Sequence, residues 1–456
     1  MTFSIYNTQS RDQQQVEISG RPITIYCCGP TVYRDAHVGN LRTFLLSDLI
    51  SRVLKLLGNE VLLIQNITDV GHMSEDFEDQ DKLLSQAKLE KTDPFEIARK
   101  YEARFHTDLA RLNIAPAEKY PRASETIDGM LSSIQKLIDN GSAYVAESGS
   151  VYFSAQTFPS YGAISGNRLD ALKPGHRYEY SGDGEKKFHA DSALWKSAGA
   201  RSEMVWDSPW GRGFPGWHIE CTAMSLDLLD QHIDIHVGGI DLRFPHHENE
   251  RAQSNSIIGK EAVDLWVHGE HLLFEGRKMS KSANNVVLVE DLISKEIDPL
   301  ALRLALMENR YRSQMDLTWE SLRAAHATLQ RWRTAMANWG DSADLYADSE
   351  IIAALSEDLD TPKALLRLRA IEKDQNLSPQ SKREIFNFAD QVLALDLSRV
   401  IEIKPLSADQ GALLAQRALA RANKDWGESD RLRDLLASDG IAISDGPDGQ
   451  SWSWLS

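Results

Sequence analysis

The run of residues 23–28, ITIYCC, is a β-rich segment that stops abruptly at Gly29-Pro30. Leucines at helical spacing follow from about residue 40, and Gly58 ends that pattern before a second apolar run at 61–64. Strand, loop, helix and strand in this order form a βαβ unit, which builds a parallel sheet. The sequence therefore predicts an α/β protein with a Rossmann-like sheet. Ligands bind such sheets at the carboxyl ends of the strands, where the loop carrying Cys28, Thr31 and His37 is expected.

The composition is that of a water-exposed globular protein. Among 456 residues, 42% are hydrophobic and 26% are charged, and no apolar run is long enough to span a membrane. The net charge of -17 argues against indiscriminate binding of nucleic acid or membranes, although a local basic face is compatible with it. Three cysteines cannot form a disulfide framework, and the first residues have neither a secretory nor a transit pattern. We expect a cytoplasmic protein.

The chain is too long for one compact core, and its patterns change four times. Residues 141–207 are rich in Gly, Ser and Pro, and interrupt the sheet domain, whereas no strand pattern is visible from about 299 until the last residues. We therefore expect five segments: the first half of the sheet domain at 1–140, an insertion at 141–207, the second half at 208–298, an α-helical bundle at 299–405 and a small C-terminal unit at 406–456.

Cysteine, histidine and glutamate side chains suggest a metal site. Cys27 and Cys28 are consecutive in a strand and point to opposite faces, so at most one of them can join a given site. Cys221 lies on a predicted helix, and His246 and Glu250 share a face of the next one. Two thiolates, an imidazole and a carboxylate suit zinc. Spacing alone leaves open the ordinary alternative of packed thiols and a surface helix pair.

Two other segments suggest phosphate chemistry. His37-Val38-Gly39-Asn40 stands at a predicted helix N-terminus, where free N–H groups and the helix dipole favour an anion. Lys278 and Lys281 lie in a polar loop and could stabilise a leaving pyrophosphate. The chain has neither a G-x-G-x-x-G motif after its first strand nor a P-loop, which argues against a dinucleotide oxidoreductase and a P-loop ATPase.

Taken together, the HVGN segment at 37–40 and the KMSKS segment at 278–282 resemble the paired signatures of class I aminoacyl-tRNA synthetases. Further motifs resemble the cysteinyl-tRNA synthetase family within that class: YCCGPTVY at 26–33, GWHIEC at 216–221, DIH at 234–236, FPHHENE at 244–250 and KDW at 424–426. The resemblance runs almost from end to end. It implies a catalytic Rossmann-like domain with an insertion, a helical tRNA-binding bundle and a C-terminal anticodon-binding unit.

The resemblance also implies an activity and roles for individual residues. The activity is ATP-dependent formation of cysteinyl-AMP from L-cysteine and its transfer to the 3′ end of tRNA(Cys), with one Zn²⁺ per chain, Mg²⁺ accompanying ATP, and a monomeric protein. The implied zinc ligands are Cys28, Cys221, His246 and Glu250, and the implied cysteine-binding residues are Thr31, Thr68, Trp217 and His236. The implied catalytic residues are His37, Asn40, Lys278 and Lys281, and the ATP-binding set adds Gly39, Gly238, Gly239, Asp241, Ser280 and Ser282.

Some points depart from the family pattern or stay open. Asn40 stands where the class signature has its second histidine, and it can donate hydrogen bonds but carries no charge. Two alternatives remain: a cysteine ligase that acts on an amino sugar, and a non-catalytic, synthetase-like tRNA-binding or regulatory protein. Basic residues of the two C-terminal segments suit phosphate contacts with tRNA: Arg303, Arg310, Arg312, Arg323, Arg331, Arg333, Arg417, Arg421, Lys424, Arg431 and Arg433.

Overall fold

The computed structural model describes residues 2–17, 20–70, 73–74, 77–171, 184–279, 285–400, 406–446 and 449–454. Its centre is a four-stranded parallel sheet in the order β12-β11-β3-β4. The strands are β3 (Ile23–Cys27), β4 (Val61–Gln65), β11 (Ile233–Gly239) and β12 (Val263–Gly269). Every residue of β3 and β11 is buried, as expected for inner strands of a parallel sheet. The predicted Rossmann-like sheet is confirmed.

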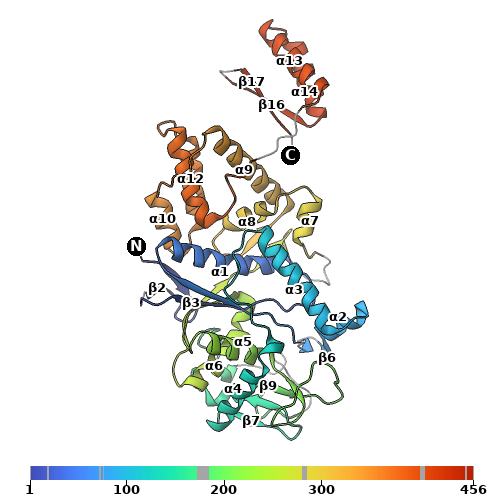
Figure 1. Cartoon of the computed structure of the whole chain (residues 1–456), viewed down its shortest axis with the longest axis vertical. Helices are drawn as coiled ribbons and strands as arrows, with labels where there is room; N and C mark the ends of the chain where they lie inside the picture. The colour runs from blue at the N-terminus through green and yellow to red at the C-terminus, as the bar shows by residue number, and fades with distance from the viewer. Residues whose placement is uncertain are drawn as a thin grey trace.

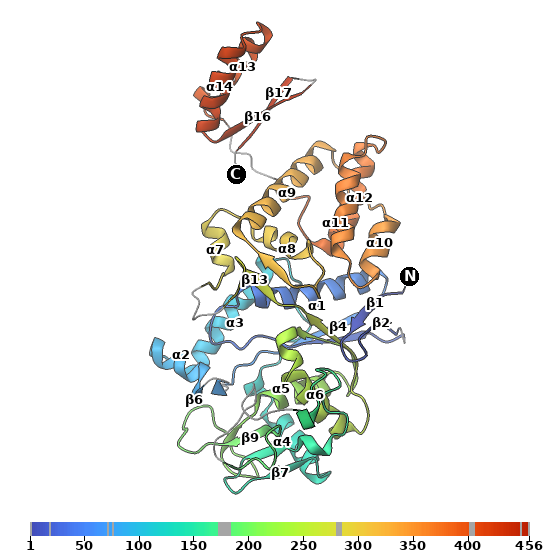
Figure 2. The same cartoon turned by 180° about the vertical axis from the view of Figure 1, so that it is seen from behind.

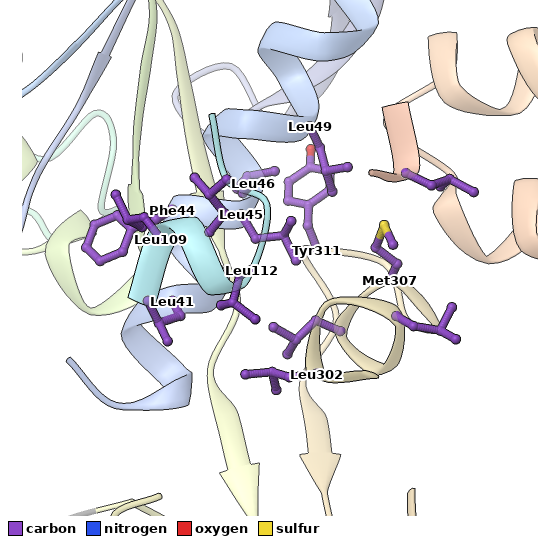
Figure 3. Close-up of a cluster of buried hydrophobic side chains, with 14 of the residues drawn as sticks. Leu41, Phe44, Leu45, Leu46, Leu49, Leu109, Leu112, Leu302, Met307 and Tyr311 are labelled. Atoms are coloured by element: carbon purple, nitrogen blue, oxygen red, sulfur yellow. The ribbon is translucent and has the colours of Figure 1, made fainter. Parts of the chain in front are cut away.

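Helix α1 (Val38–Leu56) forms the crossover from β3 to β4 and lies in the middle of the molecule (Figure 1). One of its faces meets residues far along the chain: Figure 3 shows Leu41, Leu45 and Leu49 beside Leu302 and Tyr311. All of these side chains belong to one buried hydrophobic cluster. The start of α1, and with it the HVGN segment, is thereby held between the sheet and the helical region.

The segments before and after the first βαβ unit add short strands and helices around the sheet. The elements are the hairpin β1 (Ser4–Asn7) and β2 (Asp12–Gln15), the pair β5 (Met73–Ser74) and β6 (Phe77–Asp81), and the helices α2 (Lys82–Glu90), α3 (Pro94–Arg111), η1 (Ala123–Glu125) and α4 (Ile127–Asp139). The asparagine that ends β1 donates its side-chain N–H to the carbonyl of Asp264, which fixes the hairpin to β12. The hairpin thus extends the sheet domain at its β12 edge.

The inserted region builds a second sheet, antiparallel and in the order β10-β9-β8-β7. Its elements are β7 (Ala143–Val145), β8 (Val151–Phe153), η2 (Ala155–Thr157), η3 (Leu169–Ala171), β9 (Ser192–Ser197) and β10 (Gly213–Pro215). The chain then returns to the main sheet through α5 (Trp217–Leu228), η4 (Ile240–Arg243) and α6 (His246–Ile258). Figures 1 and 2 show β7 and β9 at one end of the long axis, with α5 and α6 between them and the main sheet.

The region from about residue 270 onward is mainly helical, with one difference from the prediction. Its elements are β13 (Leu272–Phe274), β14 (Arg277–Lys278), α7 (Val289–Ser294), α8 (Pro299–Met307), β15 (Met315–Leu317), α9 (Trp319–Asn338), α10 (Ser349–Ser356), α11 (Thr361–Lys373) and α12 (Pro379–Leu393). β15 pairs in parallel with β13, although the sequence suggested helices alone after about residue 299. Three residues are too few for a strand period to be visible in a sequence.

The last unit contains α13 (Ala408–Ala422), α14 (Trp426–Ser438) and the hairpin β16 (Ile441–Gly446) with β17 (Gly449–Trp454). The hairpin pairs the last described strand with the one directly before it, and two helices precede it. The unit lies at the opposite end of the long axis from the inserted sheet (Figures 1 and 2). No helix within the described ranges is long and apolar enough to cross a membrane.

Candidate metal centre and nucleotide site

The carboxyl ends of the main strands bring the predicted pocket residues together. Cys28 directly follows β3, and its backbone N–H donates to the carbonyl of Val237 in β11 at 3.2 Å. Thr68, beyond the end of β4, donates its N–H to Pro30 O at 3.1 Å and forms a parallel bridge with Thr31. His236 lies within β11. Thr31, Thr68, Cys28 and His236 therefore share one rim of the sheet, as the βαβ unit predicts.

A buried cluster of thiol, imidazole and carboxylate groups lies behind this rim. One ligand atom from each of Cys28, Cys221, His246 and Glu250 lies within 4.8 Å of the others, and all four side chains are buried. The Sγ atoms of Cys28 and Cys221 are 3.9 Å apart, and Oε1 of Glu250 is 2.8 Å from Nε2 of His246. The helices α5 and α6 supply three of the four groups, so the cluster depends on their packing against β3.

The donor set fits a thiophilic cation. Tetrahedral zinc with Zn–S bonds of about 2.3 Å separates two thiolates by about 3.8 Å, close to the sulfur–sulfur distance here. Burial raises the pKa of Cys28 and of Glu250 well above their ordinary values, while the hydrogen bond from Cys28 lowers the pKa of Cys221. Thiol and carboxyl ligands lose their protons when they bind a metal, so metal binding here would release protons. The cluster could therefore bind a metal such as zinc.

The neighbouring cysteine behaves differently. Cys27 points to the other face of the sheet, is fully buried, and joins neither group of candidate ligands. Burial raises the pKa of its thiol to about 12. It is a packed side chain, as the alternation along a strand predicts.

The structure adds His247, a residue that the sequence did not single out. A second group of candidate ligands, Cys28, His236, His247 and Glu250, also lies within 4.8 Å. Nε2 of His247 is 3.4 Å from Sγ of Cys28. Helical spacing pairs His247 with Arg251, which is no metal ligand, and this hid its approach to the site. The sequence contains no signal for this contact, because His247 approaches Cys28 at the end of β3 and not a residue of its own helix.

Aromatic rings cover the cluster. The ring of Trp217 stacks on His246 with centroids 4.2 Å apart, and Trp266 stacks on His236 at 4.5 Å. The hydroxyl of Thr68 lies 3.5 Å from Oε2 of Glu220, which precedes the candidate ligand Cys221. These contacts put Trp217, Thr68 and His236, three predicted pocket residues, around the same buried groups.

The start of α1 forms a reciprocal cap. Nδ1 of His37 accepts from the backbone N–H of Gly39 at 3.1 Å and of Asn40 at 3.3 Å, while Oδ1 of Asn40 accepts from the N–H of His37 at 3.2 Å. Burial, and secondarily the charge of Arg34, lowers the pKa of His37 to about 4, so the ring is neutral near pH 7. Since Nδ1 accepts, the proton is on Nε2, which is a donor. Asn40 thus has a structural role that needs no charge.

The two signature segments meet. The N–H of Val38 donates to the carbonyl of Val287 at 3.0 Å, and a Cβ on Gly39 would lie only 2.9 Å from the Cε of Met279. Lys278 is exposed at the end of β14. The predicted residues Ser280, Lys281 and Ser282 lie outside the described residues. The chain on both sides of them is therefore in contact with the first turn of α1.

The predicted adenosine-binding residues lie beside this helix start. Gly238 and Gly239 end β11, and Asp241 follows in η4. The negative charge of Asp241 raises the pKa of His37, against the larger lowering that burial causes. The structure thus brings Asp241 and His37 to one side of the sheet's carboxyl end.

Several arginines predicted to meet tRNA phosphates are buried instead, and for these the prediction was wrong. Arg303 is fully buried, and its guanidinium donates to Asp48 Oδ2 at 2.7 Å and to backbone carbonyls. Arg333 donates to Asp298 at 2.6 Å, and Arg417 to Asp445 at 2.9 Å. Arg323 is exposed on α9. A cation count cannot distinguish a side chain that meets a carbonyl from one that faces solvent.

Known proteins place this combination of sheet, helix start and buried cluster among the class I tRNA synthetases. Residues 14–327 match the family model described as the tRNA synthetases class I (C) catalytic domain. Residues 404–452 match the model described as the cysteinyl-tRNA ligase anticodon binding domain. The fold is similar to that of a Mycobacterium tuberculosis methionyl-tRNA synthetase in complex with methionyl-adenylate, with a TM-score of 0.54 at 14% identity over 82% of this chain and 90% of that one.

The chain belongs to the cysteine–tRNA ligase family. It is 40% identical over 482 residues to a cysteine–tRNA ligase of Thermus thermophilus, covering 99% of both chains. It is also 37% identical to the cysteine–tRNA ligase of Chlamydia muridarum over 98% of this chain and 99% of that protein. A ligase that acts on an amino sugar needs no anticodon-binding unit, so the match of residues 404–452 to that model argues against this alternative.

Proposed function

We propose that this protein is a cysteine–tRNA ligase that activates L-cysteine with ATP and transfers it to tRNA(Cys). The observation that carries the proposal is the buried set of Cys28, Cys221, His246 and Glu250 at the rim where the two class I signature segments meet. Full-length relatives that are named cysteine–tRNA ligases support it. The cytoplasmic location and the monomeric state expected from the sequence remain predictions.

In this proposal the buried cluster holds one Zn²⁺. The ion would supply soft Lewis acidity that favours the thiolate of cysteine over the hydroxyl of serine. Cys28 and Cys221 would bind the ion through sulfur, His246 through a ring nitrogen and Glu250 through a carboxylate oxygen. Trp217 stacks over His246. Thr31, Thr68 and His236 line the adjoining pocket and orient the substrate.

The nucleotide would bind at the start of α1, with Mg²⁺ as its counter-ion. The cysteine carboxylate attacks the α-phosphate of ATP, the bond from that phosphorus to the bridging oxygen breaks, and pyrophosphate leaves. His37 donates from Nε2 to phosphate oxygen, and Lys278 with Lys281 offsets the charge of the leaving group. Gly39, Gly238, Gly239, Asp241, Ser280 and Ser282 complete the proposed ATP site. Asn40 acts by fixing His37 through the cap.

The second step transfers the cysteinyl group from AMP to a hydroxyl of the terminal ribose of tRNA. The helical region 299–405 and the C-terminal unit 406–456 are proposed to hold that tRNA, and the match to an anticodon-binding model supports this for residues 404–452. The exposed cations on these elements, among them Arg323 on α9, are the proposed phosphate contacts.

The experiment that tests the proposal is cysteine-dependent exchange between ATP and pyrophosphate, followed by charging of a tRNA with the cysteine anticodon. Exchange that a thiophilic chelator abolishes and Zn²⁺ restores, together with charging, is the expected result. Exchange without charging would indicate a different acceptor. Absence of exchange from zinc-loaded protein would contradict catalysis and leave a binding role.

A further inference from the structure

A line of hydrogen-bonding groups runs from the buried cluster to the N-terminal hairpin. Nε2 of His247 lies 3.4 Å from Sγ of Cys28, and its Nδ1 lies 2.8 Å from Nε2 of His268. Nδ1 of His268 lies in turn 2.8 Å from Oγ1 of Thr8. The two histidines are 0% and 4% exposed, whereas Thr8 is only partly buried at the turn after β1. The line therefore joins a candidate metal ligand to the molecular surface.

The chemistry of the groups gives this line a direction. One proton makes each of these contacts, whether between two ring nitrogens or between a ring nitrogen and a hydroxyl. A neutral imidazole donates from one nitrogen and accepts at the other. Burial lowers the pKa of His268 to about 3, so that ring is neutral. If the hydroxyl of Thr8 donates to His268, then His268 donates to His247, and His247 donates to the sulfur of Cys28. A thiolate at Cys28 can only accept, so metal ligation by that sulfur would set this order of donors along the whole line.

The backbone holds each member of the line in place. The N–H of Thr8 donates to the carbonyl of Trp266 at 2.8 Å, which anchors the turn to β12. His268 is opposite Gly238 in the register of β12 with β11. A Cβ on Gly238 would lie 2.4 Å from Cε1 of His247, so only glycine leaves room for that ring. Backbone contacts or close packing thus hold all three groups in place, unlike a loose contact between surface side chains.

We propose that Thr8, His268 and His247 are a positioning chain that keeps an N–H donor on the sulfur of Cys28 and thereby tunes how strongly that thiolate binds the metal. The proposal rests on the proposed function, because it assumes a metal in the cysteine pocket. A hydrogen bond to a thiolate draws charge from the sulfur and weakens its donation, which leaves the metal more receptive to an incoming substrate thiolate. In this assignment His247 is a donor to a ligand, while Cys221, His246 and Glu250 complete the ligand set.

The test uses full-length protein loaded with Co²⁺ or Zn²⁺. Thr8→Val removes the hydroxyl at nearly constant shape, and Thr8→Ser keeps it. The readouts are the thiolate-to-cobalt charge-transfer band, the rate of zinc loss to a chelator, and KM and kcat for cysteine in ATP–pyrophosphate exchange. Thr107→Val, which removes an exposed hydroxyl on α3 that bonds only within its helix, is the matched control.

The expected result is a shifted charge-transfer band and a KM for cysteine raised about threefold to tenfold in Thr8→Val. This is below the loss of about 10-fold to 100-fold for groups directly behind a metal ligand, because two rings separate Thr8 from the sulfur. Thr8→Ser and Thr107→Val should behave as wild type. His268→Leu should exceed Thr8→Val, and His268→Gln, whose amide can donate to His247, should lie between wild type and His268→Leu. A wild-type band and KM in Thr8→Val would overturn the chain. Wild-type protein that takes up neither metal would instead refute the metal site itself, and the chain with it.

Discussion

Two regions of this molecule bury polar side chains, and they do so in opposite ways. Around Arg303, each charged group meets a partner within the chain: the guanidinium donates to Asp48 and to the carbonyls that end α3 and α12. In the cluster of Cys28 and Glu250, a thiol and a carboxyl face each other beside the rings of His246 and His236, and Oε2 of Glu250 has no hydrogen-bond partner among the described residues. The first region is complete as folded. The second leaves a carboxylate oxygen unsatisfied, which a metal would satisfy.

The largest effect is expected from breaking the complete region. Arg303→Met leaves Asp48 with Arg52 as its remaining cation and removes the donor to the buried carbonyls of Leu112 and Leu393, and should lower the free energy of unfolding by about 3 kcal/mol. Urea denaturation measures this. The affinity of the folded fraction for tRNA should stay unchanged. A variant of normal stability that binds tRNA weakly would reinstate Arg303 as a phosphate contact.

Breaking the incomplete region should cost activity. Cys221→Ser replaces a soft donor with a hard one, and should reduce cysteine-dependent exchange more than about 100-fold, above the loss caused by groups behind a ligand. Metal content per chain should fall with it, as measured by elemental analysis. Cys27→Ser is the matched control, because that thiol is also buried but points away, and it should keep its metal. Equal metal content in the two variants would exclude Cys221 as a ligand.

A third polar group, the partly buried His37, extends the comparison to pH. The pKa of His37 is about 4 in the folded chain and about 6.5 when unfolded, so between these values the unfolded chain binds more protons. The free energy of unfolding should therefore fall as pH falls, by about 2 kcal/mol between pH 7 and 5 from this group. His37→Asn keeps a capping acceptor and removes the titration, and should flatten the curve of melting temperature against pH. Parallel curves for wild type and variant would refute the lowered pKa of His37.

The sequence predicted the parts of the molecule whose patterns are local. The run at 23–28, the leucines of α1 and the His246–Glu250 spacing each have a period that a single segment displays, so the sheet, its first crossover and the face carrying those two side chains were predictable. The family resemblance then joined segments that no periodicity connects. The resemblance thereby assigned Cys28 and Cys221, which are 193 positions apart, to one set of predicted metal ligands.

What the sequence did not predict depends on partners brought from elsewhere in the chain. β15 is a strand only because β13 lies beside it, and β17 only because β16 turns back on it. His247 matters through Cys28, which follows β3, and through His268, which lies in β12. Arg303 and the exposed Arg323 look alike in the sequence, because the feature that separates them is a set of carbonyls from α3 and α12.

The smallest effect concerns an arginine that faces solvent. Arg323 on α9 is the counterpart of Arg303 in the same helical region, and Arg323→Gln should leave the free energy of unfolding unchanged within about 0.5 kcal/mol. If it meets a phosphate, tRNA binding should weaken for all tRNAs alike, and the slope of log K against log salt should fall by about one unit. Binding measured across a salt series, with cysteine exchange as the control for an intact site, tests both. An unchanged slope would place the phosphate contacts on other elements, and would show that exposure alone is no better guide to tRNA binding than the cation count was.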